Sequence, residues 1–164
     1  MTEKERTAIL AGGCFWGMEE LLRKVPGVIS TVVGYTGGNL EGPLYEDVKT
    51  GATGHVEAVK IVFDEAVLPY RALLEFFFNI HDPTTPNRQG GDIGSQYRSV
   101  IFYTDEDQHN VAVEVKKDVN RSGKWKVPVV TQIMPAKKFW DAEEYHQKYL
   151  IKHPNGYTCH FIRR

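Results

Sequence analysis

The sequence has 164 residues, a length typical of a single domain that buries a sizeable core. Hydrophobic residues make up 41% of it and charged residues 25%, which indicates a globular chain and excludes a disordered one. Because the net charge is -1 and no basic block is present, we expect neither a nucleic-acid partner nor attraction to a membrane surface.

Nothing in the sequence predicts export or membrane insertion. The apolar segment near the N-terminus is too short for a signal peptide, and the longest apolar stretch, residues 73–80, is interrupted by Glu75 and Asn79. No repeat or linker divides the chain. We therefore expect a cytoplasmic protein with one domain over residues 1–164 and a mobile tail at residues 154–164.

The first third of the chain alternates strand and helix signals. A short buried strand is predicted at residues 8–11, and residues 15–25 have apolar side chains at helical spacing up to the Pro-Gly pair at 26–27. The segment 28–35 is rich in β-branched residues and predicts a second strand. A polar loop is expected from there to residue 54.

The rest of the chain continues this alternation. Residues 55–63 alternate as a strand does, residues 69–80 begin with proline and have helical spacing, and residues 82–95 form a Pro- and Gly-rich loop that is long enough to be functional. The later elements are expected as a strand at 97–103, an amphipathic helix at 105–121 capped by Asp105 or Thr104, a strand at 128–134 and a helix at 141–153. This order predicts an α+β fold, a ferredoxin-like two-layer sandwich with a mixed sheet, packed helices and long loops.

The two cysteines are too far apart in the sequence for a zinc cluster or a disulfide scaffold. Cys14 follows a Gly-Gly turn and precedes a predicted helix, so it should lie at a helix start, where free N–H groups and the macrodipole favour a thiolate. Cys159 lies in the turn-rich tail. The alternative for either cysteine is a small buried hydrophobic residue. The six histidines show no metal-ligand spacing, and we expect no metal site.

Trp16 and Glu57 are further candidates for chemistry. Trp16 points away from the apolar side of the predicted helix, which favours the wall of a pocket, with packing against the long loops as the alternative. Strand alternation places Glu57 on the face that carries Ile61 and Phe63. A carboxyl group in apolar surroundings resists ionisation and can act as a general acid near neutral pH. The alternative is a structural carboxyl group near a strand end.

Four segments, in this order, resemble motifs of the type A peptide methionine sulfoxide reductase family. They are Gly13-Cys14-Phe15-Trp16-Gly17, Pro43-Leu44-Tyr45, Gly54-His55-Val56-Glu57 and the run GDIGSQYRS at residues 91–99. The resemblance extends from about Thr7 to about Leu150. Val56 departs from the alanine that is usual in the family, which should not disturb Glu57.

The resemblance implies a single catalytic domain with an α+β fold and with neither a metal nor an organic cofactor. In such enzymes the motif cysteine, here Cys14, attacks the sulfur of a methionine sulfoxide of S configuration, free or in a protein, and becomes a sulfenic acid. The resemblance implies that Phe15 and Trp16 form a wall that binds the methyl group, and that Glu57, Tyr45 and Tyr97 donate protons to the oxygen. It also implies polar support from Asp92. His146 takes part in substrate binding, or is a structural histidine as the alternative.

Cys159 then completes the cycle that the resemblance implies. Its thiol condenses with the sulfenic acid of Cys14, and thioredoxin reduces the resulting disulfide. Such an enzyme repairs oxidised proteins during oxidative stress. A purely structural role for Cys159 is the alternative.

Two other functions remain open on sequence grounds. In a cysteine hydrolase or acyl transferase, Cys14 would pair with a histidine such as His55 or His146. In a binding module without catalysis, both cysteines would be inert. Only the reductase needs Cys159 for turnover.

Overall fold

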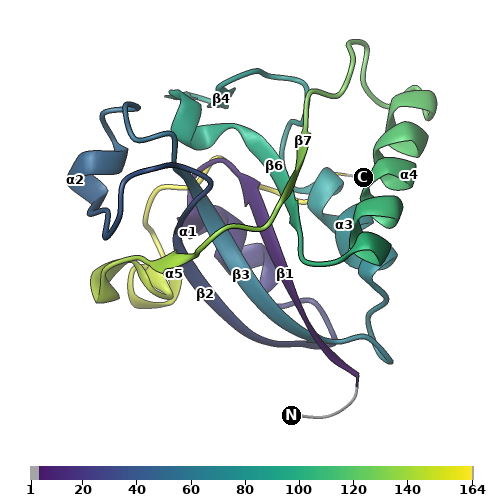
Figure 1. The fold of residues 1–164 in the computed structure, drawn as a ribbon, viewed down its shortest axis with the longest axis horizontal. Coiled ribbons are helices and arrows are strands. Elements are labelled where there is room, and N and C mark those ends of the chain that lie inside the picture. Colours follow the sequence, from purple (N-terminus) through teal and green to yellow (C-terminus); the bar gives the residue numbers. More distant parts are fainter. Residues whose placement is uncertain (1–3, 164) are drawn as a thin grey trace.

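The computed structural model describes residues 4–163 (Figure 1). Its main sheet has six strands within this range, β1 (Glu5–Gly12), β2 (Val28–Thr36), β3 (Val56–Asp64), β6 (Ser99–Tyr103), β7 (Gln132–Pro135) and β8 (Trp140–Asp141). Two short strands, β4 (Arg88–Gln89) and β5 (Asp92–Ile93), form a separate hairpin. The α-helices are α1 (Phe15–Leu22), α2 (Tyr45–Val48), α3 (Tyr70–Asn79), α4 (Glu106–Arg121) and α5 (Tyr149–Lys152), with single 3₁₀ turns at Ser95–Tyr97 and Glu144–His146.

The strand order of the main sheet is β7-β6-β1-β3-β2-β8. Its four central strands pair antiparallel, and β7 pairs parallel with β6, so the sheet is mixed. Since β3 lies between β1 and β2, helix α1 connects two strands that are not neighbours, which is the ferredoxin-like arrangement. Figure 1 shows α3 and α4 side by side next to this sheet, and α1 packs on β1, β2 and β3. The predicted α+β sandwich with a mixed sheet is confirmed.

The apolar side chains of β3 divide between the two faces of the sheet as strand alternation predicts. Val59, Ile61 and Phe63 belong to the large core beneath the helices. Val56 and Ala58 belong to a smaller apolar cluster on the opposite face. Glu57 therefore shares the face that the helices cover, and it is 2% exposed.

Several predicted elements differ in extent from the observed ones. Helix α1 ends at Leu22 rather than at residue 25, because the residue before Pro26 is disfavoured in a helix. The strand predicted at 97–103 is confined to Ser99–Tyr103, and the strand predicted at 128–134 is observed at Gln132–Pro135. The loop between residues 36 and 54 contains the single-turn helix α2, which is too short to give a periodic signal.

The helix predicted at residues 141–153 is wrong over most of its length. Asp141 belongs to β8, and only Tyr149–Lys152 is α-helical. Lys148 has a φ of 52°, in the left-handed region, which a continuous helix cannot contain. This conformation allows its backbone N–H to donate to the buried carboxylate of Glu19 at 2.8 Å.

None of the helices described between residues 4 and 163 combines the length and the apolar character that crossing a membrane requires.

Candidate active site

The turn between β1 and α1 places Cys14 at the start of the helix. Gly13 adopts a φ of 98°, which favours glycine, and Cys14 is the N-cap residue of α1, with a φ of -55° and a ψ of 124°. Its side chain is 9% exposed. The predicted placement at a helix start is confirmed.

Cys14 lines a cavity of about 110 Å³ that is built from both ends of the chain. The residues that line it are Cys14, Phe15, Trp16, Tyr45, Glu57, Asp92, Tyr97 and Tyr157. They come from the start of α1, helix α2, strands β3 and β5, the 3₁₀ turn at Ser95–Tyr97 and the C-terminal tail. The structure thus brings seven of the nine sequence-predicted residues to one cavity, and His146 and Cys159 lie just outside it.

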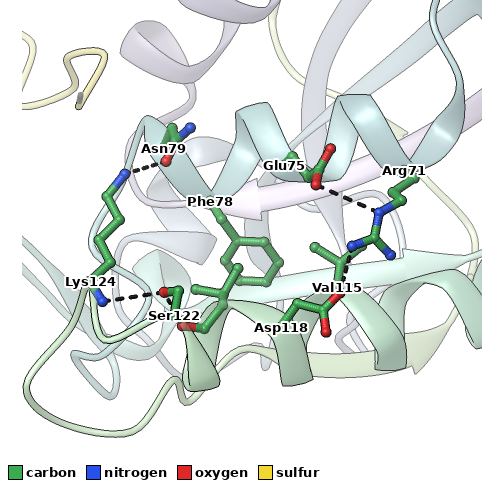
Figure 2. Close-up of a pocket in the computed structure, with 9 residues that line it drawn as sticks. Arg71, Glu75, Phe78, Asn79, Val115, Asp118, Ser122 and Lys124 are labelled. Carbon is green, nitrogen blue, oxygen red and sulfur yellow. Dashed lines mark hydrogen bonds and ion pairs between the residues drawn. The ribbon is translucent and has the colours of Figure 1, made fainter.

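A larger cavity of about 310 Å³ lies between α3 and α4 (Figure 2). Its charged side chains already have partners, since Arg71 contacts both Glu75 and Asp118, and Lys124 donates to Asn79. It is lined by neither a thiol nor an imidazole. We therefore place the chemistry in the smaller cavity.

Glu57 enters this cavity from β3 and is held by the start of the helix. Its Oε1 accepts the backbone N–H of Phe15 at 3.1 Å. Burial raises the pKa of Glu57 to about 8, against the opposing effect of that hydrogen bond, and the nearby charge of Asp92 raises it further. The carboxyl group is therefore mostly protonated at neutral pH.

The thiol of Cys14 is also protonated. Burial raises its pKa far above the ordinary value, and the nearby Glu57 raises it further, whereas the backbone N–H of Trp16 only lowers it in part. The expectation that the helix start stabilises a thiolate is therefore wrong. The desolvation of a nearly enclosed sulfur outweighs the partial charge of one helix end.

Two phenols face the same cavity as protonated donors. Burial and the proximity of Glu57 raise the pKa of both Tyr45 and Tyr97. Tyr45 is fixed at the start of α2, where its backbone N–H donates to Glu143 Oε2 at 2.9 Å. The other oxygen of Glu143 accepts the Tyr35 hydroxyl at 2.8 Å, so a carboxylate with no sequence signal of its own orients α2.

Asp92 and Tyr157 form the polar side of the cavity. The Tyr157 hydroxyl donates to Asp92 Oδ2 at 3.2 Å, and burial raises the pKa of Asp92. Sequence reasoning missed Tyr157. Its position two residues before Cys159 in the tail is the only signal that pointed to it.

Trp16 forms one wall of the cavity and is held rigidly from behind. Its indole ring stacks on Tyr149, with ring centroids 3.7 Å apart and planes at 8°. Its Nε1–H donates to His146 Nδ1 at 2.9 Å. The predicted orientation of Trp16 toward a pocket agrees with this geometry.

The structure places His146 behind Trp16 rather than in the lining of the cavity. The imidazole is 2% exposed and lies among the rings of Phe15, Trp16 and Tyr45. Because its Nδ1 accepts from Trp16, the ring proton of the neutral form lies on Nε2, for which no hydrogen-bond partner exists among the described residues. Burial lowers its pKa.

Neither His55 nor His146, the two histidines named as examples for a hydrolase, is available to Cys14. His55 accepts the Gly38 N–H at Nδ1 and contacts the Leu40 carbonyl through Nε2 at 2.7 Å, so both ring nitrogens are engaged. His146 is engaged by Trp16. The geometry therefore disfavours the hydrolase and acyl transferase alternative.

Cys159 lies beside the cavity, on the side of Asp92. Its Sγ is 3.9 Å from Asp92 Oδ2 and 3.9 Å from the Gln89 carbonyl oxygen. Cys14 and Cys159 are both free thiols. Across residues 4–163, His, Cys, Asp and Glu form no group of three or more that could hold a metal ion.

Comparisons with known proteins agree on one family. The family model described as "Peptide methionine sulfoxide reductase" matches residues 6–164. Proteins named "Peptide methionine sulfoxide reductase MsrA" from Mycolicibacterium gilvum and Nocardia farcinica are both 58% identical over 163 residues, which is 99% of this chain and 94% and 93% of theirs.

Solved structures of Mxr1 from Saccharomyces cerevisiae are similar to this one to different degrees. The reduced form has a TM-score of 0.94 at 38% identity, over 100% of this chain and 95% of that one. An unusual oxidised form has a TM-score of 0.71 at 38% identity, over 98% and 90% of the two chains. A complex with Trx2 has a TM-score of 0.69 at 29% identity, over 100% and 94%.

Proposed function

The chain belongs to the peptide methionine sulfoxide reductase family, and from this membership we propose that it reduces methionine S-sulfoxide, free and in proteins, with Cys14 as the nucleophile. The observation that carries the proposal is the convergence of a neutral carboxyl group and two phenols on the cavity that holds the Cys14 thiol. A sulfoxide oxygen leaves sulfur only when it is protonated, and these three groups are proton donors.

The cavity fits the end of an oxidised methionine side chain. Phe15 and Trp16 offer apolar ring surface to the methyl group, and Glu57, Tyr45 and Tyr97 offer hydrogen-bond donors to the oxygen. Asp92 and Tyr157 complete the polar side. A volume of about 110 Å³ is large enough to admit a methyl sulfinyl group.

The first half of the cycle begins from a thiol and a carboxylic acid. Glu57 donates its proton to the sulfoxide oxygen, which makes the substrate sulfur electrophilic, and the carboxylate that results takes up the thiol proton as Cys14 attacks. The oxygen passes to Cys14, which becomes a sulfenic acid, and methionine leaves. The raised pKa of Cys14 is compatible with this sequence, because its base is generated by the preceding step.

In the second half, Cys159 attacks the sulfenic acid, water leaves and a Cys14–Cys159 disulfide forms. Thioredoxin then reduces the disulfide by thiol exchange. The yeast structures support this cycle, since Mxr1 was solved in reduced, oxidised and Trx2-bound forms. The present chain, with two free thiols, has a higher TM-score against the reduced form than against the other two. Movement of the tail at residues 154–164 during the cycle is part of this proposal.

This chemistry suits the repair of oxidised proteins in the cytoplasm, where thioredoxin keeps thiols reduced. No step requires an organic cofactor or a metal ion.

The intact mass of the protein tests the proposal. Reduced protein is incubated with methionine sulfoxide and no reductant, and we expect a loss of two hydrogens together with one methionine released per chain. With Cys159→Ser, we expect the gain of one oxygen on Cys14 instead. An unchanged mass in both proteins contradicts the proposal, and it is the result that a hydrolase would give, because hydrolysis does not reduce a sulfoxide.

A further inference from the structure

The tail residues around Cys159 are held against the start of α1 by His160. This imidazole is 7% exposed, and its Nε2 lies 2.7 Å from the carbonyl oxygen of Gly12, the last residue of β1. The backbone N–H of His160 donates to Thr158 Oγ1 at 3.1 Å, which fixes the chain on either side of Cys159. Farther along, the Arg163 N–H donates to the Asn79 carbonyl at 2.8 Å.

Two glycines provide the space in which His160 lies. A Cβ at Gly17 would overlap both Thr158 Oγ1 and His160 Nδ1, and a Cβ at Gly13 would lie 3.1 Å from His160 Nε2. Gly17 is inside α1, where glycine is less favourable than alanine. The tail crosses α1 at Gly17, which explains why this position has no side chain.

The hydrogen bond to Gly12 fixes the tautomer of His160. A carbonyl oxygen only accepts, so Nε2 must carry the proton. Burial lowers the pKa of His160 to about 4, and the ring is therefore neutral, with an unprotonated Nδ1. This nitrogen is 3.9 Å from Cys159 Sγ, the same distance as Asp92 Oδ2 and the Gln89 carbonyl oxygen.

We propose that His160 is a positioning residue for the second half of the cycle, and that its Nε2–H···O=C bond to Gly12 holds Cys159 in reach of Cys14. The inference rests on the proposed function. In the step concerned, the S–H bond of Cys159 and the S–O bond of the Cys14 sulfenic acid break, an S–S bond forms, and the hydroxyl group leaves as water with the thiol proton. The sulfur of Cys14 is reduced and that of Cys159 is oxidised.

Two substitutions of His160 distinguish the effect of the hydrogen bond to Gly12 from that of Nδ1 acting as a base. In His160→Gln the side-chain amide nitrogen occupies the place of Nε2 and keeps a donor toward Gly12. In His160→Asn the amide reaches only the place of Nδ1, so the bond to Gly12 is lost. Gly17→Ala displaces the tail from the other side without changing His160. His109→Asn, on α4, is the matched control.

The experiment follows both half-reactions in one single turnover with methionine sulfoxide and no reductant. Methionine release reports the first half, and the loss of two hydrogens, with dimedone trapping of the sulfenic acid, reports the second. We expect the His160 and His109 variants to release one methionine at the wild-type rate. In Gly17→Ala the displaced tail also carries Tyr157 of the cavity, so its disulfide formation is compared with its own rate of methionine release. Disulfide formation should be slowed about 10- to 100-fold in His160→Asn and Gly17→Ala, and it should remain within about threefold in His160→Gln and His109→Asn.

The outcomes distinguish a failure of this inference from a failure of the proposed function. Equal slowing in His160→Gln and His160→Asn would assign the effect to Nδ1 and overturn the inference, as would wild-type disulfide formation in His160→Asn and Gly17→Ala. Slowed methionine release in the His160 variants would also overturn it, because the bond would then support Cys14 itself. Failure of the wild-type protein to release methionine would instead contradict the proposed function.

Discussion

Burial raises the pKa of both Cys14 and Glu57, so the reaction starts with both groups protonated. Both groups are acids in a small buried cavity, and desolvation raises the pKa of each. A thiolate next to a carboxylate would place two negative charges in that cavity. The neutral pair avoids this cost and leaves the proton of Glu57 available to the substrate oxygen.

Glu57→Gln removes this proton and keeps the shape of the side chain. The amide oxygen can still accept the Phe15 N–H, so we expect the fold to be retained. The rate constant for methionine formation in a single turnover should fall about 10²- to 10⁴-fold, measured by rapid quench. Glu106→Gln, at an exposed position of α4, is the control. A wild-type rate for Glu57→Gln would contradict the assignment of Glu57 as the acid.

Tyr45 and Tyr97 should contribute to catalysis only through their hydroxyl groups. Tyr45→Phe and Tyr97→Phe each remove one donor to the oxygen, and we expect each to lower kcat/KM about 10- to 100-fold with thioredoxin as reductant. Tyr103→Phe, on β6 and packed on His109 instead, should leave kcat/KM unchanged. If neither substitution in the cavity lowers kcat/KM, the phenols do not bind the oxygen.

Active-site residues that have a recognisable pattern in the neighbouring sequence could be predicted, and active-site residues without such a pattern could not. Cys14 follows a Gly-Gly turn, Trp16 lies off the apolar stripe, and Glu57 alternates with core residues. Tyr157 reaches the cavity only because the tail folds back over the start of α1, which leaves no periodic trace. The pKa of Cys14 was mispredicted because a sequence indicates a helix start but not the depth of burial.

At the scale of elements, a buried carboxylate joins α1, β2 and the segment before α5. Glu19 is 1% exposed; its Oε2 accepts from Thr31 Oγ1 at 2.8 Å and from Lys148 Nζ at 2.9 Å. Its Oε1 accepts the Lys148 backbone N–H. This network holds the chain that carries His146 and Tyr149 behind Trp16, and it explains why residues 141–153 do not form one helix.

Lys148→Met tests the network through stability. The substitution leaves Glu19 buried without its cation, and since Lys148 is itself 38% exposed we expect the low end of the usual loss, about 3 kcal/mol in the free energy of unfolding. Adding Glu19→Gln should restore part of it. Lys152→Met is the exposed control, and urea denaturation is the measurement. A loss below about 1 kcal/mol would show that the pair contributes little.

The N-cap of α4 gives a second test at this scale. The sequence left Thr104 and Asp105 open, and in the structure Asp105 Oδ1 accepts the Gln108 N–H at 2.8 Å. Asp105→Ala should therefore lower the free energy of unfolding by about 1 kcal/mol, whereas Asp107→Ala should change it little. Equal effects of the two substitutions would indicate a general charge effect on the helix rather than capping.

At the scale of the whole molecule, the periodic elements and the order of strands and helices were predictable, and they were enough to indicate the α+β class. The elements that were missed are short, as α2 and β8 are, and contacts with distant parts of the chain hold them. Tyr45 at the start of α2 depends on Glu143, 98 residues away. Such pairings have no signature within a sequence window.

The cavity is likewise a product of the whole chain. Residues from the first helix, the central strand and the tail meet in it, so its protonation state is set by the complete fold rather than by any motif. The central claim is that reduction starts from a neutral Glu57 and a Cys14 thiol.

The pH dependence of methionine formation in a single turnover by Cys159→Ser tests this claim most directly. Glu57, with a pKa of about 8, is protonated below that pH and ionised above it. The account predicts a rate constant that is level from about pH 6 to pH 7.5, falls as the pH rises through about 8, and loses this fall in Glu57→Gln. A rate constant that instead rises with pH across this range, in both proteins, would show that a Cys14 thiolate limits the reaction and would contradict the account.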